Sequence, residues 1–242
     1  MSLVSAGTLM SGTREYLYRG VQQLPIVLSA TSLLFSITTG SIAHVNLTVG
    51  LVALMPIYTF ILQKVFGLIF SKTAPTSRYS WTKSTSDVCR LVPPEGPKLT
   101  FYRPDEGNAD SVPSYWLMSV VFFIGYCISN AVDIYSSPAE NDADPNNKER
   151  RTYQAVFLIT SICLLSTLVL GARFYYMSGC EGRGVLGYTG SFIAAVGAAS
   201  IGYAMYEFSR KCGARTSDLF GVLSQILPNS ATASNPVVCT SN

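Results

Sequence analysis

Long segments with almost no charge dominate this chain. Four of them are 24–70, where Lys64 is the only charged residue, 111–132, 152–172 and 184–206. Charged residues make up 13% of the sequence, about half the share that is usual in a soluble domain. An uncharged helix of about 20 residues spans the ~30 Å hydrocarbon core of a bilayer at ~1.5 Å per residue. The segments therefore predict helices that cross a membrane.

We expect an all-α membrane protein with about five transmembrane helices and a polar loop domain between spans two and three. The expected spans are 25–43, 47–70, 115–135, 153–172 and 185–206. Only residues 44–46 separate the first two spans, which predicts a tight hairpin with His44 in its turn. Trp116 and Tyr135 flank the third span, as is typical of residues at a membrane interface.

The distribution of polar residues divides the chain into five regions. They are an N-terminal interfacial segment (1–24), a transmembrane hairpin (25–70), an extramembrane loop domain (71–113), spans three to five (114–209) and a C-terminal tail with an amphipathic helix at 218–227 (210–242). The loop domain has six prolines, six basic and five acidic residues, which places it outside the lipid. With five spans, ten basic residues lie on the side of the N-terminus and six on the other. The excess favours a cytosolic N-terminus.

Small residues recur every four positions in the fifth span, at Gly190, Ala194, Ala198 and Gly202. This spacing puts them on one helix face, where they allow a neighbouring helix to approach closely. Packing within this chain is the simpler interpretation, and contact between copies in a homo-oligomer is the alternative.

Groups that could carry chemistry are sparse. Within or near the spans lie Lys64, Ser129, Asn130 and Asp133, for which a structural role is favoured over ion or proton transport. His44 is the only histidine, and no catalytic or metal-binding pattern surrounds it. The net charge of +3 is too small to indicate nucleic acid. We therefore expect no enzyme, no cofactor and no metal.

The six cysteines fall into two groups. Cys127 and Cys163 lie in the middle of spans, where cysteine behaves as a small apolar residue. The topology puts Cys89 and Cys180 on one side of the membrane, and Cys212 and Cys239 on the other. Two same-side disulfides and four free thiols are both compatible with this arrangement.

The second half of the chain resembles a family of multi-spanning membrane proteins from nucleocytoplasmic large DNA viruses (the phycodnavirus and mimivirus assemblage). The segments that carry the resemblance are 113–118 (PSYWLM), 129–131 (SNA), 179–181 (GCE), 206–207 (YE), 212–215 (CGAR), 217–221 (SDLFG), 226–231 (ILPNSA) and 236–239 (PVVC). They fall within about 113–240, a little over half of the chain.

The resemblance implies a non-enzymatic structural protein of an icosahedral virion. It would lie in the virion inner membrane, and in a host intracellular membrane during assembly, with lipid and capsid or minor capsid proteins as partners. For such a virion we expect Cys212 and Cys239 to be the pair most readily bonded, since both follow the last span. Two alternatives stay open: an accessory subunit of a cellular membrane complex, for example mitochondrial, and a small channel or transporter.

Overall fold

The computed structural model describes residues 6–73, 112–136, 145–176, 180, 184–212 and 219. Its elements are α1 (Ala6–Thr39), α2 (Ile42–Val49), the π-helical turn η1 (Gly50–Leu54), α3 (Met55–Thr73), α4 (Tyr115–Ser136), α5 (Pro145–Tyr176) and α6 (Gly184–Lys211). The expected all-α fold is confirmed for this part of the chain.

Within the residues that the structure describes, four stretches are long and apolar enough, by length and composition, to cross a membrane. They are Arg19–Thr39, Ile42–Ile69, Tyr115–Ser136 and Thr152–Tyr175. These correspond to the first four expected spans, and α6 is not among them.

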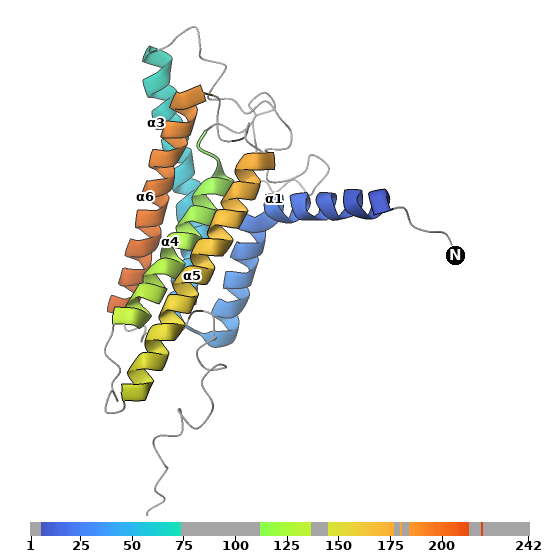
Figure 1. The fold of residues 1–242 in the computed structure, drawn as a ribbon. Helices are drawn as coiled ribbons and strands as arrows, with labels where there is room; N and C mark the ends of the chain where they lie inside the picture. The colour runs from blue at the N-terminus through green and yellow to red at the C-terminus, as the bar shows by residue number, and fades with distance from the viewer. Residues whose placement is uncertain are drawn as a thin grey trace, which may run out of the picture.

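The long helices run alternately in opposite directions along one bundle, and α2, η1 and α3 follow one another as a single rod (Figure 1). At the upper end in that view, Gln63 Nε2 donates to Pro113 O at 3.0 Å and the Arg173 guanidinium lies 4.8 Å from the Trp116 ring centre. At the lower end, Tyr126 Oη donates to Ala43 O at 2.6 Å. These two regions are called the upper end and the lower end of the bundle.

Helix α1 departs from the expected boundaries at both of its ends. It is helical from Ala6, with Pro25 inside it, and its first part runs across the bundle axis (Figure 1). Proline is an ordinary cause of such a bend, because it cannot donate the main-chain hydrogen bond. At its other end the helix stops before Gly40, whose φ of 61° is left-handed, a conformation that glycine adopts at little cost. The turn therefore precedes His44, and the prediction that His44 lies in the turn is wrong.

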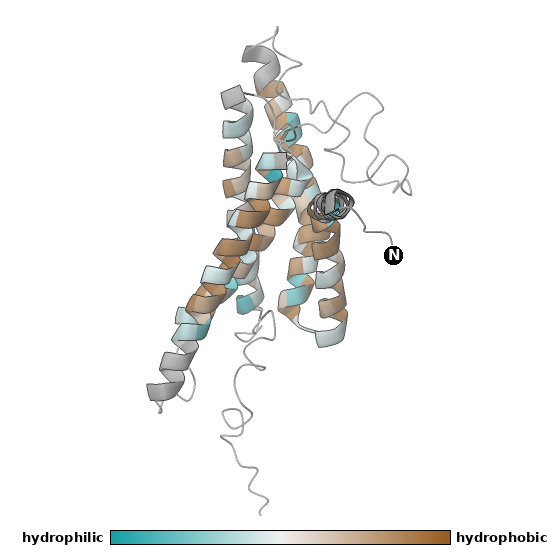
Figure 2. Ribbon diagram, turned by 45° about the vertical axis from the view of Figure 1, so that its right-hand side comes forward, coloured by the Kyte–Doolittle hydropathy of each residue, from teal (hydrophilic) through white to brown (hydrophobic). Residues whose placement is uncertain are grey.

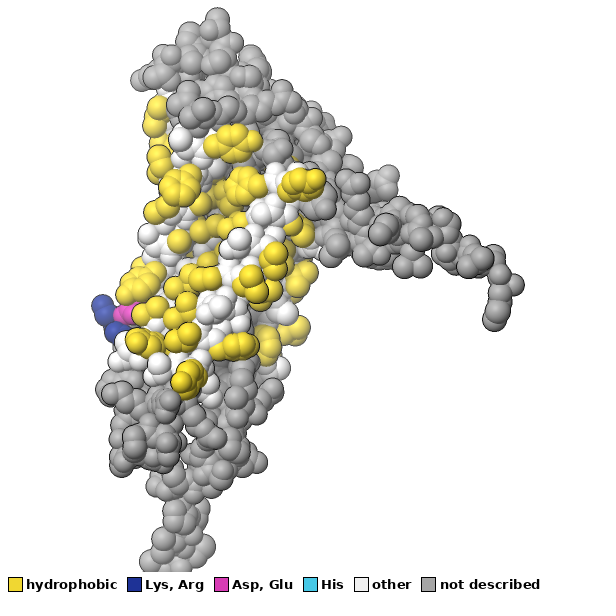
Figure 3. Space-filling model, viewed as in Figure 1, with side chains coloured by type: hydrophobic (Ala, Val, Ile, Leu, Met, Phe, Trp, Pro, Cys, Tyr) yellow, Lys and Arg dark blue, Asp and Glu magenta, His cyan; other side chains and the backbone are white. Residues whose placement is uncertain are grey.

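Helix α4 lies at the centre of the bundle, and α1 and α5 lie at its margin. In the most apolar 18-residue window of each helix, 67% of α4 is buried but only 11% of α1 and of α5. The exposed side chains of the outer helices are largely apolar, among them Ile37, Phe157 and Leu164. Figure 2 shows the hydrophobic residues along the middle of the bundle, and in Figure 3 hydrophobic side chains cover most of the described part of one face. Such a surface suits contact with lipid.

The backbones of α4 and α6 approach each other closely at two glycines. A Cβ placed on Gly125 would lie 2.9 Å from the Ala199 Cα and closer still to the Ala199 carbonyl oxygen. A Cβ on Gly202 would lie 3.0 Å from the Tyr126 nitrogen and closer to the Phe122 carbonyl oxygen. In both places the obstacle is backbone, which cannot move aside as a flexible side chain can.

We expect Gly125→Ala to destabilise the protein by about 1–3 kcal/mol, because the added methyl group forces α4 and α6 apart. Thermal unfolding in detergent measures this change. Gly171→Ala in α5 is the matched control, since a Cβ there meets no atom within 4 Å. Equal midpoints for the two variants would show that the backbones do not touch at Gly125.

Candidate functional site

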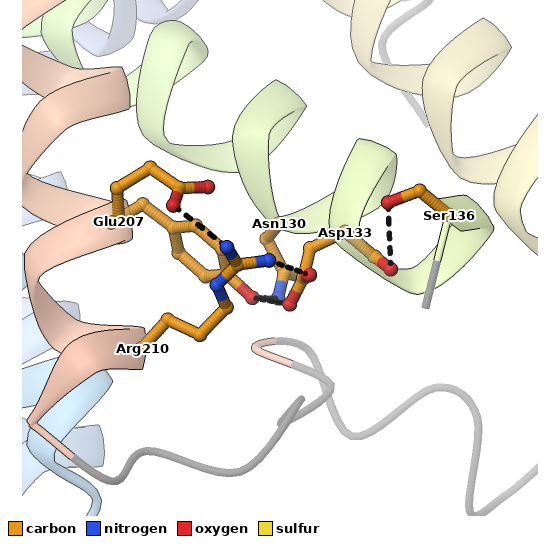
Figure 4. Close-up of polar contacts among 6 residues, drawn as sticks. Asn130, Asp133, Ser136, Glu207 and Arg210 are labelled. Carbon is orange, nitrogen blue, oxygen red and sulfur yellow. Dashed lines mark hydrogen bonds and ion pairs between the residues drawn. The ribbon is translucent and has the colours of Figure 1, made fainter. Parts of the chain in front are cut away.

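A group of polar side chains joins α4 to α6 at the lower end of the bundle. Arg210 Nη1 donates to Asp133 Oδ1 at 2.9 Å, and Tyr206 Oη donates to Asp133 Oδ2 at 3.0 Å (Figure 4). Asn130 Nδ2 donates to Tyr206 Oη at 3.0 Å. We call these four residues, with Glu207, the lower polar cluster. The Tyr206 hydroxyl donates one bond and accepts another, and each Asp133 oxygen accepts one.

Burial in the cluster is uneven between the two charges. The side chain of Asp133 is 2% exposed and that of Arg210 is 47% exposed. Arg210 Nη2 also lies 3.1 Å from Glu207 Oε2. The hydrogen bond to Asp133, followed by the charge of that carboxylate, raises the pKa of Arg210 above its ordinary value. The guanidinium therefore stays charged and neutralises a carboxylate that has lost most of its water.

A second set of hydrogen bonds ties the start of α2 to the same region. Asn46 Nδ2 donates to Ser209 Oγ at 2.8 Å, and Tyr126 Oη lies 3.1 Å from that oxygen while donating to Ala43 O. The rings of Tyr126 and Tyr206 meet edge to face, with centres 5.4 Å apart. This ring contact connects the second set to the lower polar cluster. Three helices are thus held together at one end.

His44 connects the chain beyond α6 to this end of the bundle. Its Nε2 lies 2.9 Å from Leu219 O, its Nδ1 lies 3.4 Å from Thr39 Oγ1, and its ring stacks on Phe35 with centres 5.7 Å apart. Leu219 is 5% exposed and belongs to the main hydrophobic core. His44 is therefore a buried structural histidine that anchors residue 219. Residue 219 is the only described position of the expected 218–227 helix.

The four small residues of α6 are all buried, and they face two different helices. Ala194 O accepts a hydrogen bond from Tyr58 Oη of α3 at 3.1 Å, and a Cβ on Gly190 would lie 3.8 Å from the Phe66 ring. Gly202 lies against the backbone of α4, and Ala198 is fully buried. The structure thus places this face inside the chain, against α3 and α4.

The other polar residues noted in the sequence do not join the cluster. Lys64 is exposed, with its ammonium 5.4 Å from the centre of the Phe60 ring. Ser129 Oγ is buried and makes no hydrogen bond to a described residue. Tyr206 lies in a segment of the viral resemblance, whereas Arg210, Tyr126 and Ser209 were not singled out from the sequence. The signal available in the sequence was spacing. Asn130 and Asp133 are three residues apart and Tyr206 and Arg210 are four apart, so each pair lies on one face of its helix.

The cysteines differ from the expected pairing. Cys212 is a free, exposed thiol, so the predicted Cys212–Cys239 disulfide is wrong for this structure. Cys212 directly follows the last turn of α6. Leu219, further along the chain, is buried beside His44 of α2. Cys239 lies outside the described residues. Cys180 is disulfide-bonded, and Cys127 and Cys163 are free.

The cluster is built to hold helices together. Among the described residues, no group of three or more His, Cys, Asp and Glu side chains could hold a metal ion. The buried carboxylate of Asp133 is occupied by Arg210 and Tyr206, so neither of its oxygens is left without a donor. Such saturation suits a fixed contact between helices better than a group that exchanges protons.

No protein-family model, curated protein or solved structure matches this chain.

We expect Asp133→Asn to lower the free energy of unfolding by about 1–3 kcal/mol, the usual cost of losing a hydrogen bond to a charged group. The measurement is thermal or denaturant unfolding in detergent. Glu207→Gln is the matched control, because it removes the same charge from the other side of the same guanidinium, where the carboxylate is 24% exposed. An exposed ion pair is worth about 0–1 kcal/mol. A larger effect at Glu207 than at Asp133 would contradict the assignment of Asp133 as the central acceptor.

We also expect Ala194→Leu and Ala198→Leu to cost about 1–3 kcal/mol each, since neither site has room for a branched side chain. Ala194 is 1% and Ala198 0% exposed, whereas the neighbouring Ile193 is 66% exposed. Ile193→Leu should therefore leave stability unchanged. Detergent stability and membrane expression level report both effects, and the absence of any loss at Ala194 and Ala198, as at Ile193, would place the small residues on an outer face.

Proposed function

We propose that this chain is a non-enzymatic structural protein with five transmembrane helices, embedded in the inner membrane of a large icosahedral DNA virus. In this role it links the membrane to minor capsid proteins. The observation that carries the proposal is that residues from separate segments of the viral resemblance meet in the lower polar cluster. Asn130 and Tyr206 are hydrogen-bonded to each other, and Leu219 is fixed by His44 at the same end.

The fifth span of this proposal is α6. Its uncharged stretch 184–206 is long enough to cross the bilayer. It packs along α4 from the upper end, where it begins, to the lower polar cluster, and its outward side chains include Phe192, Val196 and Tyr203. Its small residues Gly190, Ala194, Ala198 and Gly202 lie on the buried face. A helix in this position has lipid on its outer side if α4 is in the membrane.

The partners proposed are the lipid bilayer and capsid or minor capsid proteins. The loop domain 71–113, with its eleven charged residues, offers groups for a protein partner outside the lipid. The small-residue face of α6 is occupied by α3 and α4, so a homo-oligomer would have to use another face. Saturation of the Asp133 carboxylate favours a structural role over an ion pathway.

Fractionation of purified virus particles tests the proposal. We expect the chain in the particle, resistant to alkaline carbonate and released by detergent, as for an integral membrane protein. A lysine-reactive cross-linker applied to intact particles should join Lys72, Lys83 or Lys98 to a minor capsid protein.

Absence from the particles, together with co-migration with a host membrane complex on native gels, would contradict the proposal. That result would favour an accessory subunit of a cellular complex. A major capsid protein treated in parallel is the control, because carbonate should release it while the membrane protein is retained.

A further inference from the structure

We infer that the first part of α1, residues 6–24, is an arm that lies along the lipid headgroups at the upper end, with one face turned to the acyl chains and its angle held by Trp116. The arm thus gives the chain a binding surface for one leaflet of the bilayer, in addition to its spans. Of the function proposed above, only the placement of the bundle in a membrane is required.

The arm runs across the axis of the bundle. Figure 1 shows it at the upper end, where it projects away from the other described helices. A helix that crosses the axis of membrane-spanning helices at their end lies parallel to the bilayer surface. It then has hydrocarbon on one side and water on the other, so it needs one apolar and one polar face.

Helical spacing gives the arm these two faces. Apolar residues share one face, at Met10, Leu17, Val21 and Leu24. Polar residues follow one another at intervals of four on the opposite face, at Glu15, Arg19 and Gln23. Arg14 falls at the boundary between the two faces. Such a distribution is typical of a helix that lies in a membrane interface.

The described side chains show which way the apolar face is turned. Val21 and Leu24 pack against the main hydrophobic core, whereas Arg19 and Gln23 are exposed. The core lies within the bundle, which is on the membrane side of the arm. The same face continues toward the N-terminus, beyond the edge of the bundle, and is therefore turned toward the acyl chains beside it.

Trp116 of α4 holds the bend between the arm and the rest of α1. Pro25 has no N–H, so the carbonyl of Val21, four residues earlier, has no partner within the helix. Trp116 Nε1 donates to Val21 O at 2.6 Å and so satisfies the carbonyl that the proline releases. The Arg173 guanidinium lies 4.8 Å from the Trp116 ring centre, and both side chains are buried. The angle of the arm is therefore set by contacts to α4 and α5.

Photo-cross-linking of the full chain in phosphatidylcholine vesicles tests this inference. The photoreactive residue p-benzoylphenylalanine replaces Leu17 on the apolar face, Glu15 on the polar face, or Phe157 on the exposed side of α5, one at a time. We expect lipid adducts at 17 and at 157, and several-fold fewer at 15, because only the first two positions face acyl chains. Mass spectrometry of the labelled peptides counts the adducts.

Lipid adducts at 157 without adducts at 17 would overturn the inference, as would equal adducts at 15 and 17. A cross-link from 17 to a second copy of the chain or to another protein would overturn it too. Absence of lipid adducts at 157 as well would contradict the placement of the bundle in a membrane. Failure of the arm and failure of the proposed function are thus distinguishable.

Trp116→Phe tests the role of the indole, because it keeps an aromatic ring beside Arg173 and removes the N–H that binds Val21 O. We expect the excess of lipid adducts at 17 over 15 to fall several-fold as the arm loses its fixed angle. Tyr58→Phe is the matched control, since it removes a side-chain hydrogen bond to a backbone oxygen of α6 and leaves α1 untouched. An unchanged excess in Trp116→Phe would show that Trp116 does not hold the arm.

Discussion

Apolar side chains gain little from packing against each other in lipid, because the hydrocarbon around them is equally apolar. The bundle therefore depends on the contact between α4 and α6, where the backbones meet directly at Gly125 and Gly202. Close approach of this kind maximises dispersion contacts over a long interface. Helix α4 is in turn the surface on which α1, α3 and α5 are arranged, so its position on α6 determines theirs.

The lower polar cluster fixes the register of the α4–α6 contact, which the small residues alone leave open. Small residues let two helices approach, but they tolerate sliding by a turn, since similar residues recur every four positions. Asp133 can reach Arg210 and Tyr206 together in only one register. A buried carboxylate without these donors would be costly, so sliding is penalised. The glycines thus give the pair its closeness, and the polar groups give it its register.

The local sequence pattern predicted much of the fold, but it could not predict which helices pack against one another. The expected span 115–135 corresponds to α4 almost residue for residue, because length and hydrophobicity largely decide where a helix can lie in lipid. The turn after the first span was misplaced because Gly40, and not the polar residues at 44–46, ends α1. The bonds of Asp133 join residues 73 and 77 positions apart, and they depend on how two helices are rotated about their axes. Sequence spacing fixes each face but not which faces meet, and for the same reason the contact between His44 and Leu219 was missed.

Both ends of the bundle are held by side-chain hydrogen bonds, and the upper end carries a disulfide-bonded cysteine as well. At the lower end, α4 and α6 both terminate within reach of each other, so short side-chain hydrogen bonds can join them along with α2. At the upper end, Gln63 Nε2 donates to Pro113 O and Trp116 Nε1 donates to Val21 O, so side-chain contacts to the backbone join α1, α3 and α4 there. Cys180, between α5 and α6, is disulfide-bonded, so a covalent bond adds to these contacts. The helices of the bundle are thus fixed to one another at both ends, so a change at one end does not by itself release the packing at the other.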